Sequence, residues 1–167
     1  MDNSSRYAKL TEFGKKLLGK PSLNDGLVLI SKTAKDLLNA DRCSIYIYDS
    51  EKNELWTTFA DGISRIRISA DEGLAGYTIK ERKPIISNDP YKDSRFLKEI
   101  DHKTGYITKN IATSPVFSSD RKIIGVLQLL NKEGGFNKED TRFMIFFSHY
   151  ISTYLELASM FEDENEE

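Results

Sequence analysis

The chain has 167 residues, of which 39% are hydrophobic and 30% are charged, with a formal net charge of −2. This composition is typical of one globular domain with flanking helices, and it argues against a disordered chain. Apolar runs stay well short of the ~20 residues that span a membrane. The N-terminal residues lack the basic and apolar segments of an export signal. We therefore expect a cytoplasmic protein that binds no membrane.

The charge is distributed unevenly along the chain. Residues 162–167 contain five acids, which leaves 24 basic and 21 acidic residues elsewhere. Such a near-neutral body offers no electrostatic basis for binding nucleic acid, and we interpret 162–167 as an acidic tail or the start of a linker. The single cysteine, Cys43, excludes an internal disulfide and fits a reducing compartment.

Two helical patterns open the chain. Apolar residues recur at three- and four-residue steps over residues 5–18, and Pro21 ends the pattern because proline cannot continue a helix interior. Ser22 and Asp25 then form a capping pattern for a second helix that runs to about residue 40. Both helices would present an apolar stripe to a core.

Strand patterns follow the second helix. We expect strands at residues 43–48, 54–59, 63–69, 84–87, 111–116 and 123–130, with short helical stretches near 73–81 and within 89–100. A long helix closes the chain. This order predicts an α+β fold in which an antiparallel sheet of about six strands carries long N- and C-terminal helices on one face. Short helices and loops would roof a ligand pocket on the other face.

The junction between the last strand and the last helix carries a distinctive pattern. Asn131 and Lys132 follow the strand, a two-glycine loop comes next, and Phe136 and Asp140 lead into the helix. Asn137 and Asp140 are spaced as a helix-capping pair. Lys132 and Asp140 could also form an ion pair, which would add only about 0–1 kcal/mol if exposed. These roles are structural rather than catalytic.

This spacing resembles the Asn-Lys…Phe-x-x-x-Asp-Glu signature of GAF domains, sensory modules of cyclic-nucleotide phosphodiesterases, adenylyl cyclases and bacterial regulators. Thr141 stands where that signature has its final Glu. Segments 40–44, 71–76 and 104–110 are also similar to cyclic-nucleotide-binding GAF domains and occur in the same order. The resemblance covers about residues 24–155. It implies an N-terminal helix or connector at 1–21, a GAF domain at 22–161 and a tail at 162–167.

The resemblance also implies a binding site for a small molecule. In nucleotide-binding members a serine on the first strand contacts the ligand, as Ser44 would here, and backbone groups at the start of a short helix meet the phosphate. The ligand-binding positions implied in this chain are Ser44, Ala60, Asp61, Leu74, Ala75, Leu97, Asp101, Thr104, Thr108 and Gln128. The ligand would be cyclic AMP or cyclic GMP, with no further cofactor and no metal.

Three of these positions depart from the cyclic-nucleotide pattern. Ala60 and Leu97 stand where those domains can place aromatic residues, and Gln128 replaces a glutamate. The residues also have plain structural explanations, because Ser44 could be a core serine and Thr104 an ordinary loop residue. The identity of the ligand therefore stays open, as does the alternative of an empty pocket.

Catalysis is not expected from this sequence. GAF relatives that reduce methionine sulfoxide use several cysteines, whereas Cys43 stands alone on an apolar strand and reads as a buried hydrophobe. His102 and His149 are isolated, and no Cys/His cluster has metal-ligand spacing.

The last helix carries more apolar surface than one sheet face needs. Its stripe consists of Phe143, Met144, Phe147, Tyr150, Ile151, Tyr154, Leu155, Ala158 and Phe161. A partner helix, from a second copy of the chain, would cover the excess, and the alternative is a wide core-facing helix without a partner. The resulting hypothesis is a sensory domain that signals through dimeric terminal helices. The alternative is a dimerisation module with a vestigial pocket.

Overall fold

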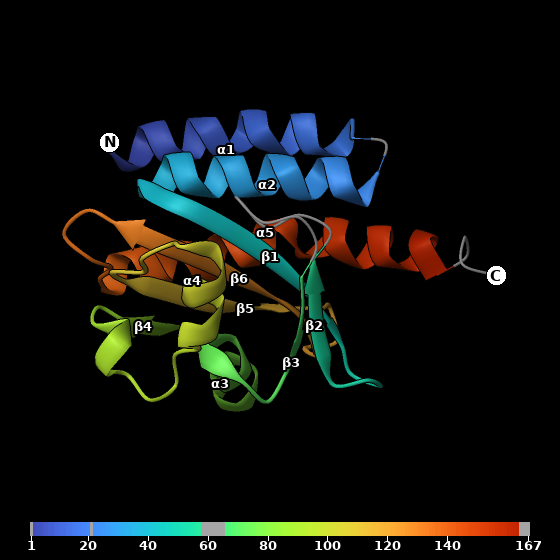
Figure 1. The fold of residues 1–167 in the computed structure, drawn as a ribbon. Helices are drawn as coiled ribbons and strands as arrows, with labels where there is room; N and C mark the ends of the chain where they lie inside the picture. Colours follow the sequence, from blue (N-terminus) through green and yellow to red (C-terminus); the bar gives the residue numbers. More distant parts are fainter. Residues whose placement is uncertain (1, 21, 58–65, 164–167) are drawn as a thin grey trace.

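The computed structural model describes residues 2–20, 22–57 and 66–163, which fold around one six-stranded sheet (Figure 1). The strand order is β3-β2-β1-β6-β5-β4, and every neighbouring pair is antiparallel. The strands are β1 (Ala40–Asp49), β2 (Glu54–Thr57), β3 (Ile66–Ser69), β4 (Ile85–Ser87), β5 (Ile111–Phe117) and β6 (Ile123–Lys132). The predicted α+β class with an antiparallel sheet of about six strands is confirmed.

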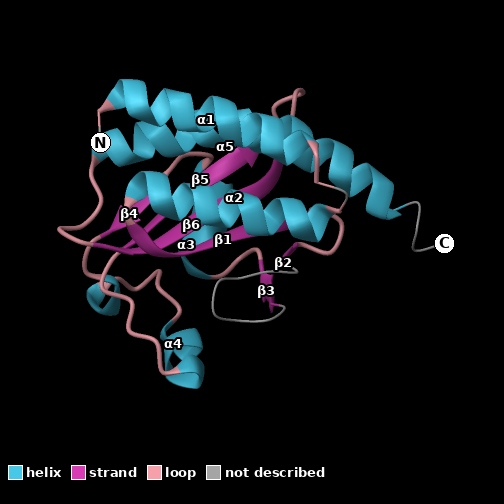
Figure 2. Cartoon of the chain, turned by 90° about the horizontal axis from the view of Figure 1, so that it is seen from above, coloured by secondary structure: helices cyan, strands magenta, loops and turns pink. Residues whose placement is uncertain are grey.

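Helices cover the sheet on both faces (Figures 1 and 2). The long helices α1 (Asn3–Leu18), α2 (Leu23–Leu38) and α5 (Lys138–Asp163) lie on one face. The shorter α3 (Gly73–Glu81), the single 3₁₀ turn η1 (Pro90–Lys92) and α4 (Lys98–Thr104) lie toward the other face. The short helix expected within 89–100 extends further, to Thr104. The parts of the expected strands 54–59 and 63–69 that fall at 58–65 lie outside the described residues.

The second helix begins and ends as its sequence predicts. The Ser22 hydroxyl accepts a hydrogen bond from the Asp25 amide at 3.2 Å, which satisfies one of the free N–H groups of the first turn. Asn39 ends the helix in the left-handed conformation, with φ of 52°, which asparagine tolerates better than most residues. The chain can therefore turn directly from α2 into β1.

Strand β1 separates two environments by simple alternation. Cys43, Ile45 and Ile47 point into the core that the sheet forms with the long helices, and all three are buried. Ser44 and Tyr46 point to the opposite face, because successive side chains of a strand face opposite ways. The strand therefore contributes an apolar row to the core and a mixed row to the other face.

The stripe on α5 is largely accounted for within the chain. Met144, Phe147, Ile151 and Leu155 are fully buried in the main core, whereas the side chains of Ala158 and Phe161 lie outside the described part of the chain. Tyr150 packs against Phe13 of α1 with ring centroids 6.1 Å apart and donates a hydrogen bond to the Leu10 carbonyl at 3.0 Å. Apolar side chains at the edge of the α5 stripe thus pack against α1 of the same chain. The sequence did not indicate this packing partner.

The junction between β6 and α5 is held by a buried ion pair. The Lys132 ammonium lies 2.5 Å from an Asp140 carboxylate oxygen, and only 3% of the Asp140 side chain is exposed. Asp140 and Asn137 also exchange hydrogen bonds as a reciprocal cap at the start of α5. The predicted pair and cap are confirmed, but the pair is buried rather than exposed. The stabilisation of about 0–1 kcal/mol expected for an exposed ion pair therefore does not apply here.

We predict that Lys132→Met destabilises the fold by about 3–5 kcal/mol, because it leaves the buried Asp140 carboxylate without its counter-charge. Thermal or urea unfolding measures this effect. Lys92→Met is the matched control, since Lys92 and Asp89 form an exposed pair at 3.5 Å whose loss costs about 0–1 kcal/mol. Equal destabilisation by the two substitutions would contradict the structural role of the buried pair.

Candidate functional site

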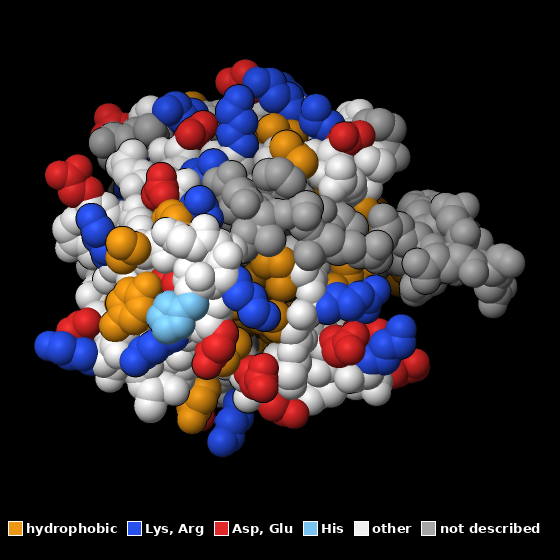
Figure 3. Space-filling view, in the orientation of Figure 1, with side chains coloured by type: hydrophobic (Ala, Val, Ile, Leu, Met, Phe, Trp, Pro, Cys, Tyr) orange, Lys and Arg blue, Asp and Glu red, His pale blue; other side chains and the backbone are white. Residues whose placement is uncertain are grey.

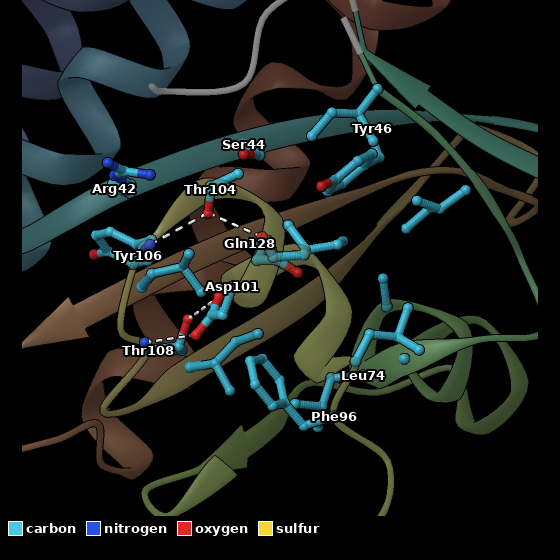
Figure 4. A pocket seen from close by; sticks show the side chains of 18 of the residues that line it. Arg42, Ser44, Tyr46, Leu74, Phe96, Asp101, Thr104, Tyr106, Thr108 and Gln128 are labelled. Carbon is cyan, nitrogen blue, oxygen red and sulfur yellow. Dashed lines mark hydrogen bonds between the residues drawn. The ribbon is translucent and has the colours of Figure 1, made fainter. Parts of the chain in front are cut away.

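A pocket lies on the face of the sheet opposite the long helices (Figure 4). Strands β1 and β6 supply its floor, and α3, α4 and the segment after α4 supply its walls. About 700 Å³ of empty space lies between these elements when the part that is open to solvent is included. Eight of the ten predicted ligand-binding residues line it, namely Ser44, Leu74, Ala75, Leu97, Asp101, Thr104, Thr108 and Gln128. The other two, Ala60 and Asp61, lie outside the described residues.

A row of polar side chains crosses the pocket floor. Ser44 of β1 pairs in register with Gln128 of β6, which in turn pairs with Thr113 of β5. Cross-strand partners lie on the same face of a sheet, so the three polar groups share the pocket face. Thr113 is bonded to the hydroxyl of Thr78 on α3. Ser44 and Gln128 are therefore the members of this row that line the pocket.

The start of α3 forms the wall that suits an anion. Gly73 begins the helix with φ of 70°, and Leu74 and Ala75 follow it along the pocket. The N-cap residue, Glu72, makes no capping hydrogen bond with its side chain. First-turn amides of a helix carry partial positive charge and bind anions when nothing caps them. This wall can therefore receive a phosphate or carboxylate group.

Asp101 organises the opposite wall rather than pointing a free carboxylate at a ligand. It accepts hydrogen bonds from the Tyr91 hydroxyl at 2.6 Å, the Thr108 amide at 2.8 Å and the Thr108 hydroxyl at 3.0 Å. The bond to Asp101 raises the pKa of Tyr91. Thr104 is also engaged, because its hydroxyl donates to the Ile100 carbonyl at 2.9 Å. These three predicted residues thus have internal partners that hold the wall in shape.

Sequence reasoning missed eleven of the residues that line the pocket, and the polar or aromatic ones among them are Arg42, Tyr46, Glu72, Phe96 and Tyr106. Strand alternation could have identified the first two, since they lie two residues before and after Ser44. The other three could not be placed from their sequence context. Phe96 stands directly before Leu97 and also lines the pocket, so an aromatic ring lies next to the position where Leu97 replaces the aromatic residue of cyclic-nucleotide-binding domains.

Two of the missed residues stack on each other at the pocket. The Arg42 guanidinium carbon lies 3.7 Å from the centroid of the Tyr106 ring, a close cation–π contact. The Tyr106 hydroxyl donates to an Asp41 carboxylate oxygen at 2.7 Å. Desolvation and this hydrogen bond raise the pKa of Tyr106. Burial likewise raises the pKa of Tyr46 to about 12, so both phenols are neutral hydrogen-bond donors at neutral pH.

The pocket is narrow in this structure. Only about 70 Å³ of its space can hold the centre of a water molecule, which corresponds to a few waters. A ligand of nucleotide size would have to displace part of a wall. Helix α4 is the wall that buries little apolar surface. All of its residues are described, and Asp101 is the one among them that is buried.

A second hollow, also with about 700 Å³ of empty space, lies between α1 and α2 and is lined mainly by charged side chains, among them Lys9, Glu12 and Lys32. Acidic and basic side chains are interspersed on the face drawn in Figure 3.

Within residues 2–20, 22–57 and 66–163, no group of three His, Cys, Asp or Glu side chains is placed to hold a metal ion. None of the described helices is long and apolar enough to cross a membrane. Cys43 is buried in the core.

The sequence of this chain is similar to a known domain family and to parts of several known proteins. The chain matches the GAF domain family over residues 23–155. It is 28% identical over 156 residues to a probable 3',5'-cyclic phosphodiesterase, pde-5, of Caenorhabditis elegans, covering 84% of this chain and 21% of that protein. It is 27% identical over 147 residues to a dual 3',5'-cyclic-AMP and -GMP phosphodiesterase 11A of Takifugu rubripes, covering 78% and 16%. The chain thus spans about one fifth or less of these relatives.

Solved structures show the same fold. The GAF domain of an Acinetobacter phosphoenolpyruvate-protein phosphotransferase superposes with a TM-score of 0.81 at 21% identity, covering 98% of this chain and 99% of that one. Free methionine-R-sulfoxide reductase of Neisseria meningitidis superposes with a TM-score of 0.77 at 14% identity, covering 96% and 94%. The family match over residues 23–155 shows that the chain belongs to the GAF domain family of regulatory, small-molecule-binding domains.

Proposed function

We propose that this domain is a non-catalytic sensor that binds a small molecule in the pocket between the sheet and α3–α4. The supporting observation is the pocket itself, in which eight residues separated by up to 84 positions in the chain converge. It combines apolar walls with a few polar groups, as small-molecule sites do.

The ligand that fits the pocket best is a purine 3',5'-cyclic nucleotide. The uncapped start of α3 provides amides for a cyclic phosphate. Ser44 and Gln128 on the floor provide hydrogen-bonding groups for a base or ribose, and Phe96 adds an aromatic surface. The relatives described above are phosphodiesterases that act on 3',5'-cyclic nucleotides by name. Their hydrolytic activity is not carried over, because this chain spans only a small part of them.

The site contacts the helices through the junction after β6. Asn131 accepts a hydrogen bond from the Lys109 amide at 2.7 Å and donates one to the Ile107 carbonyl at 2.8 Å. The next residue, Lys132, forms the ion pair with Asp140 at the start of α5. A ligand-dependent shift in the wall after α4 can therefore reach α5 through adjacent residues. The ligand biases the helix only through different affinities for the two arrangements.

The proposal includes a homodimer formed through the terminal helices. Although α1 covers one side of α5, Phe146, Leu157 and Met160 remain exposed at 44%, 51% and 63%. These positions continue a three- and four-residue spacing along the outer side of the helix. Tyr7 of α1 extends the same patch, since its ring lies 5.8 Å from that of Phe146. Exposed apolar side chains gathered along one side of a helix are typical of an interaction surface.

A second candidate function is a dimerisation module with a vestigial pocket. The narrowness of the pocket and the internal hydrogen bonds of Asp101 and Thr108 favour it. In that case the fold would bring two copies together without responding to a ligand. The two candidates differ in whether any cyclic nucleotide binds, and both keep the dimer.

For the ligand, we predict binding of cyclic AMP or cyclic GMP that calorimetry and thermal unfolding detect. Ligand at ~100 times its Kd would add about 2.7 kcal/mol of stability, which raises Tm by roughly 5–10 °C for a domain of this size. Ser44→Ala should weaken binding roughly two- to tenfold by removing one hydrogen bond.

Ser114→Ala is the matched control for the ligand experiment. Ser114 is a buried serine of β5 on the helix-facing side of the sheet, and its hydroxyl has no hydrogen-bond partner among the described residues. It should leave the affinity unchanged. If neither nucleotide produces heat or shifts Tm, the cyclic-nucleotide proposal fails and the vestigial-pocket alternative is supported.

For the dimer, we predict that Leu157→Asp converts it to a monomer, because a charge in the buried centre of an apolar interface is costly. Light scattering at micromolar concentration measures the mass in solution. Ile107→Asp is the control, since Ile107 is 63% exposed on the segment after α4, away from the patch. A parent chain that is already monomeric would overturn the dimer proposal.

A further inference from the structure

One wall of the pocket is a single short segment of the chain. Residues 96–108, here called the lid, comprise α4 and its flanking residues and supply seven of the lining side chains. In Figure 2 the α4 helix stands apart from the main body of the domain. Because α4 buries little apolar surface, polar contacts rather than core packing must hold this helix in place.

The lid is internally braced. The Asp101 carboxylate bonds both the amide and the hydroxyl of Thr108, and so ties α4 to the segment that follows it. Gly105 ends α4 in the left-handed conformation, with its amide bonded to the Asp101 carbonyl at 2.9 Å. These contacts favour movement of α4 and its following residues as one piece rather than by local unravelling.

The lid is attached to the body at its two ends and at two points between them, one of which is the hydrogen bond from the Tyr91 hydroxyl of η1 to Asp101 at 2.6 Å. At its start, Phe96 packs against Leu74, Ile85 and Ile111. At its end, the Asn131 side chain holds the Ile107 carbonyl. The intervening contact with β1 is made by Tyr106.

Tyr106 makes its contact with β1 in two ways. Its hydroxyl bonds Asp41 at 2.7 Å, and its ring stacks on the Arg42 guanidinium. Figure 4 shows Arg42 and Tyr106 side by side at one end of the pocket. A hydrogen bond between a phenol and a carboxylate is charge-assisted, but at this exposed position water can replace it.

We propose that Tyr106 is the latch of the pocket: its bond to Asp41 and its stack on Arg42 hold the lid closed, and their release opens the pocket. The narrow pocket described above is then the latched state, and a small molecule enters after the latch opens. This inference rests on the proposed function only in taking the pocket as the entry site of a ligand. The latch itself can be tested without any ligand.

The test places a reactive thiol on the pocket floor. Gln128→Cys provides it, and the rate of its reaction with N-ethylmaleimide reports how often the lid opens. The wild-type chain supplies the background, since Cys43 is fully buried on the opposite face of the sheet. In the Gln128→Cys background, Tyr106→Phe should raise the labelling rate about five- to tenfold, the effect of one lost hydrogen bond on the opening equilibrium.

Two further variants make the result specific. Asp41→Asn keeps an acceptor oxygen but removes the charge, so it should raise the rate by a smaller factor while leaving Tyr106 in place. Tyr48→Phe is the matched control. Tyr48 lies on β1, as Asp41 does, and its hydroxyl bonds Asn53 at 3.3 Å, away from the lid. It should leave the rate unchanged. Circular dichroism and thermal unfolding check that each variant is folded.

Distinct results overturn the latch and the proposed function. Equal labelling rates for the parent and a folded Tyr106→Phe variant would overturn the latch, as would a parent thiol that already reacts as fast as a free one. If Tyr106→Phe does not fold, an unchanged rate in Asp41→Asn overturns it instead. Failure of cyclic AMP and cyclic GMP to bind would overturn the ligand proposal without altering the labelling rates.

Discussion

The alternation of side chains along β1 and β6 is the constraint on which the rest of this domain depends. Each residue of a strand must face one side of the sheet or the other. In β1, Cys43 and Ile45 join the core beneath the long helices, while Ser44 and Tyr46 join the pocket. A shift of one residue in register would exchange the two sets. The apolar core therefore fixes the register, and the register in turn places the polar groups of the pocket floor.

The junction after β6 connects the two faces that the sheet separates. Asn131 reaches back to the segment that follows α4, and Lys132 reaches forward to Asp140 of α5. Asn131 adopts the left-handed conformation, with φ of 58°. This is a local irregularity near the end of β6 that lets neighbouring side chains face different sides. The residues that identify the family are thus those that link the pocket wall to the longest helix.

Much of the fold could be predicted because its signals are local. The capping residues Ser22 and Asn137, the alternation in β1 and the turn residues are readable from a few neighbouring positions. The pocket-floor residues Ser44 and Gln128 were instead indicated by the resemblance to nucleotide-binding GAF domains. The wall beyond α4 was not predicted, since Asp101 and Thr108 were expected to face a ligand and instead bond each other. That pairing depends on how the chain after α4 packs back against this short helix, and the local sequence pattern does not specify such packing.

The role of the last helix also depended on long-range packing. Its apolar stripe suggested a partner, and the stripe alone could not distinguish a second chain from α1, which starts 135 residues earlier. The sequence by itself determined the elements, the two-faced sheet and the family, because periodicity, caps and motif spacing are properties of short segments. Only the tertiary structure decided which polar groups are engaged with each other, that the Lys132–Asp140 pair is buried, and that Tyr106 reaches β1, because these follow from contacts between distant parts of the chain.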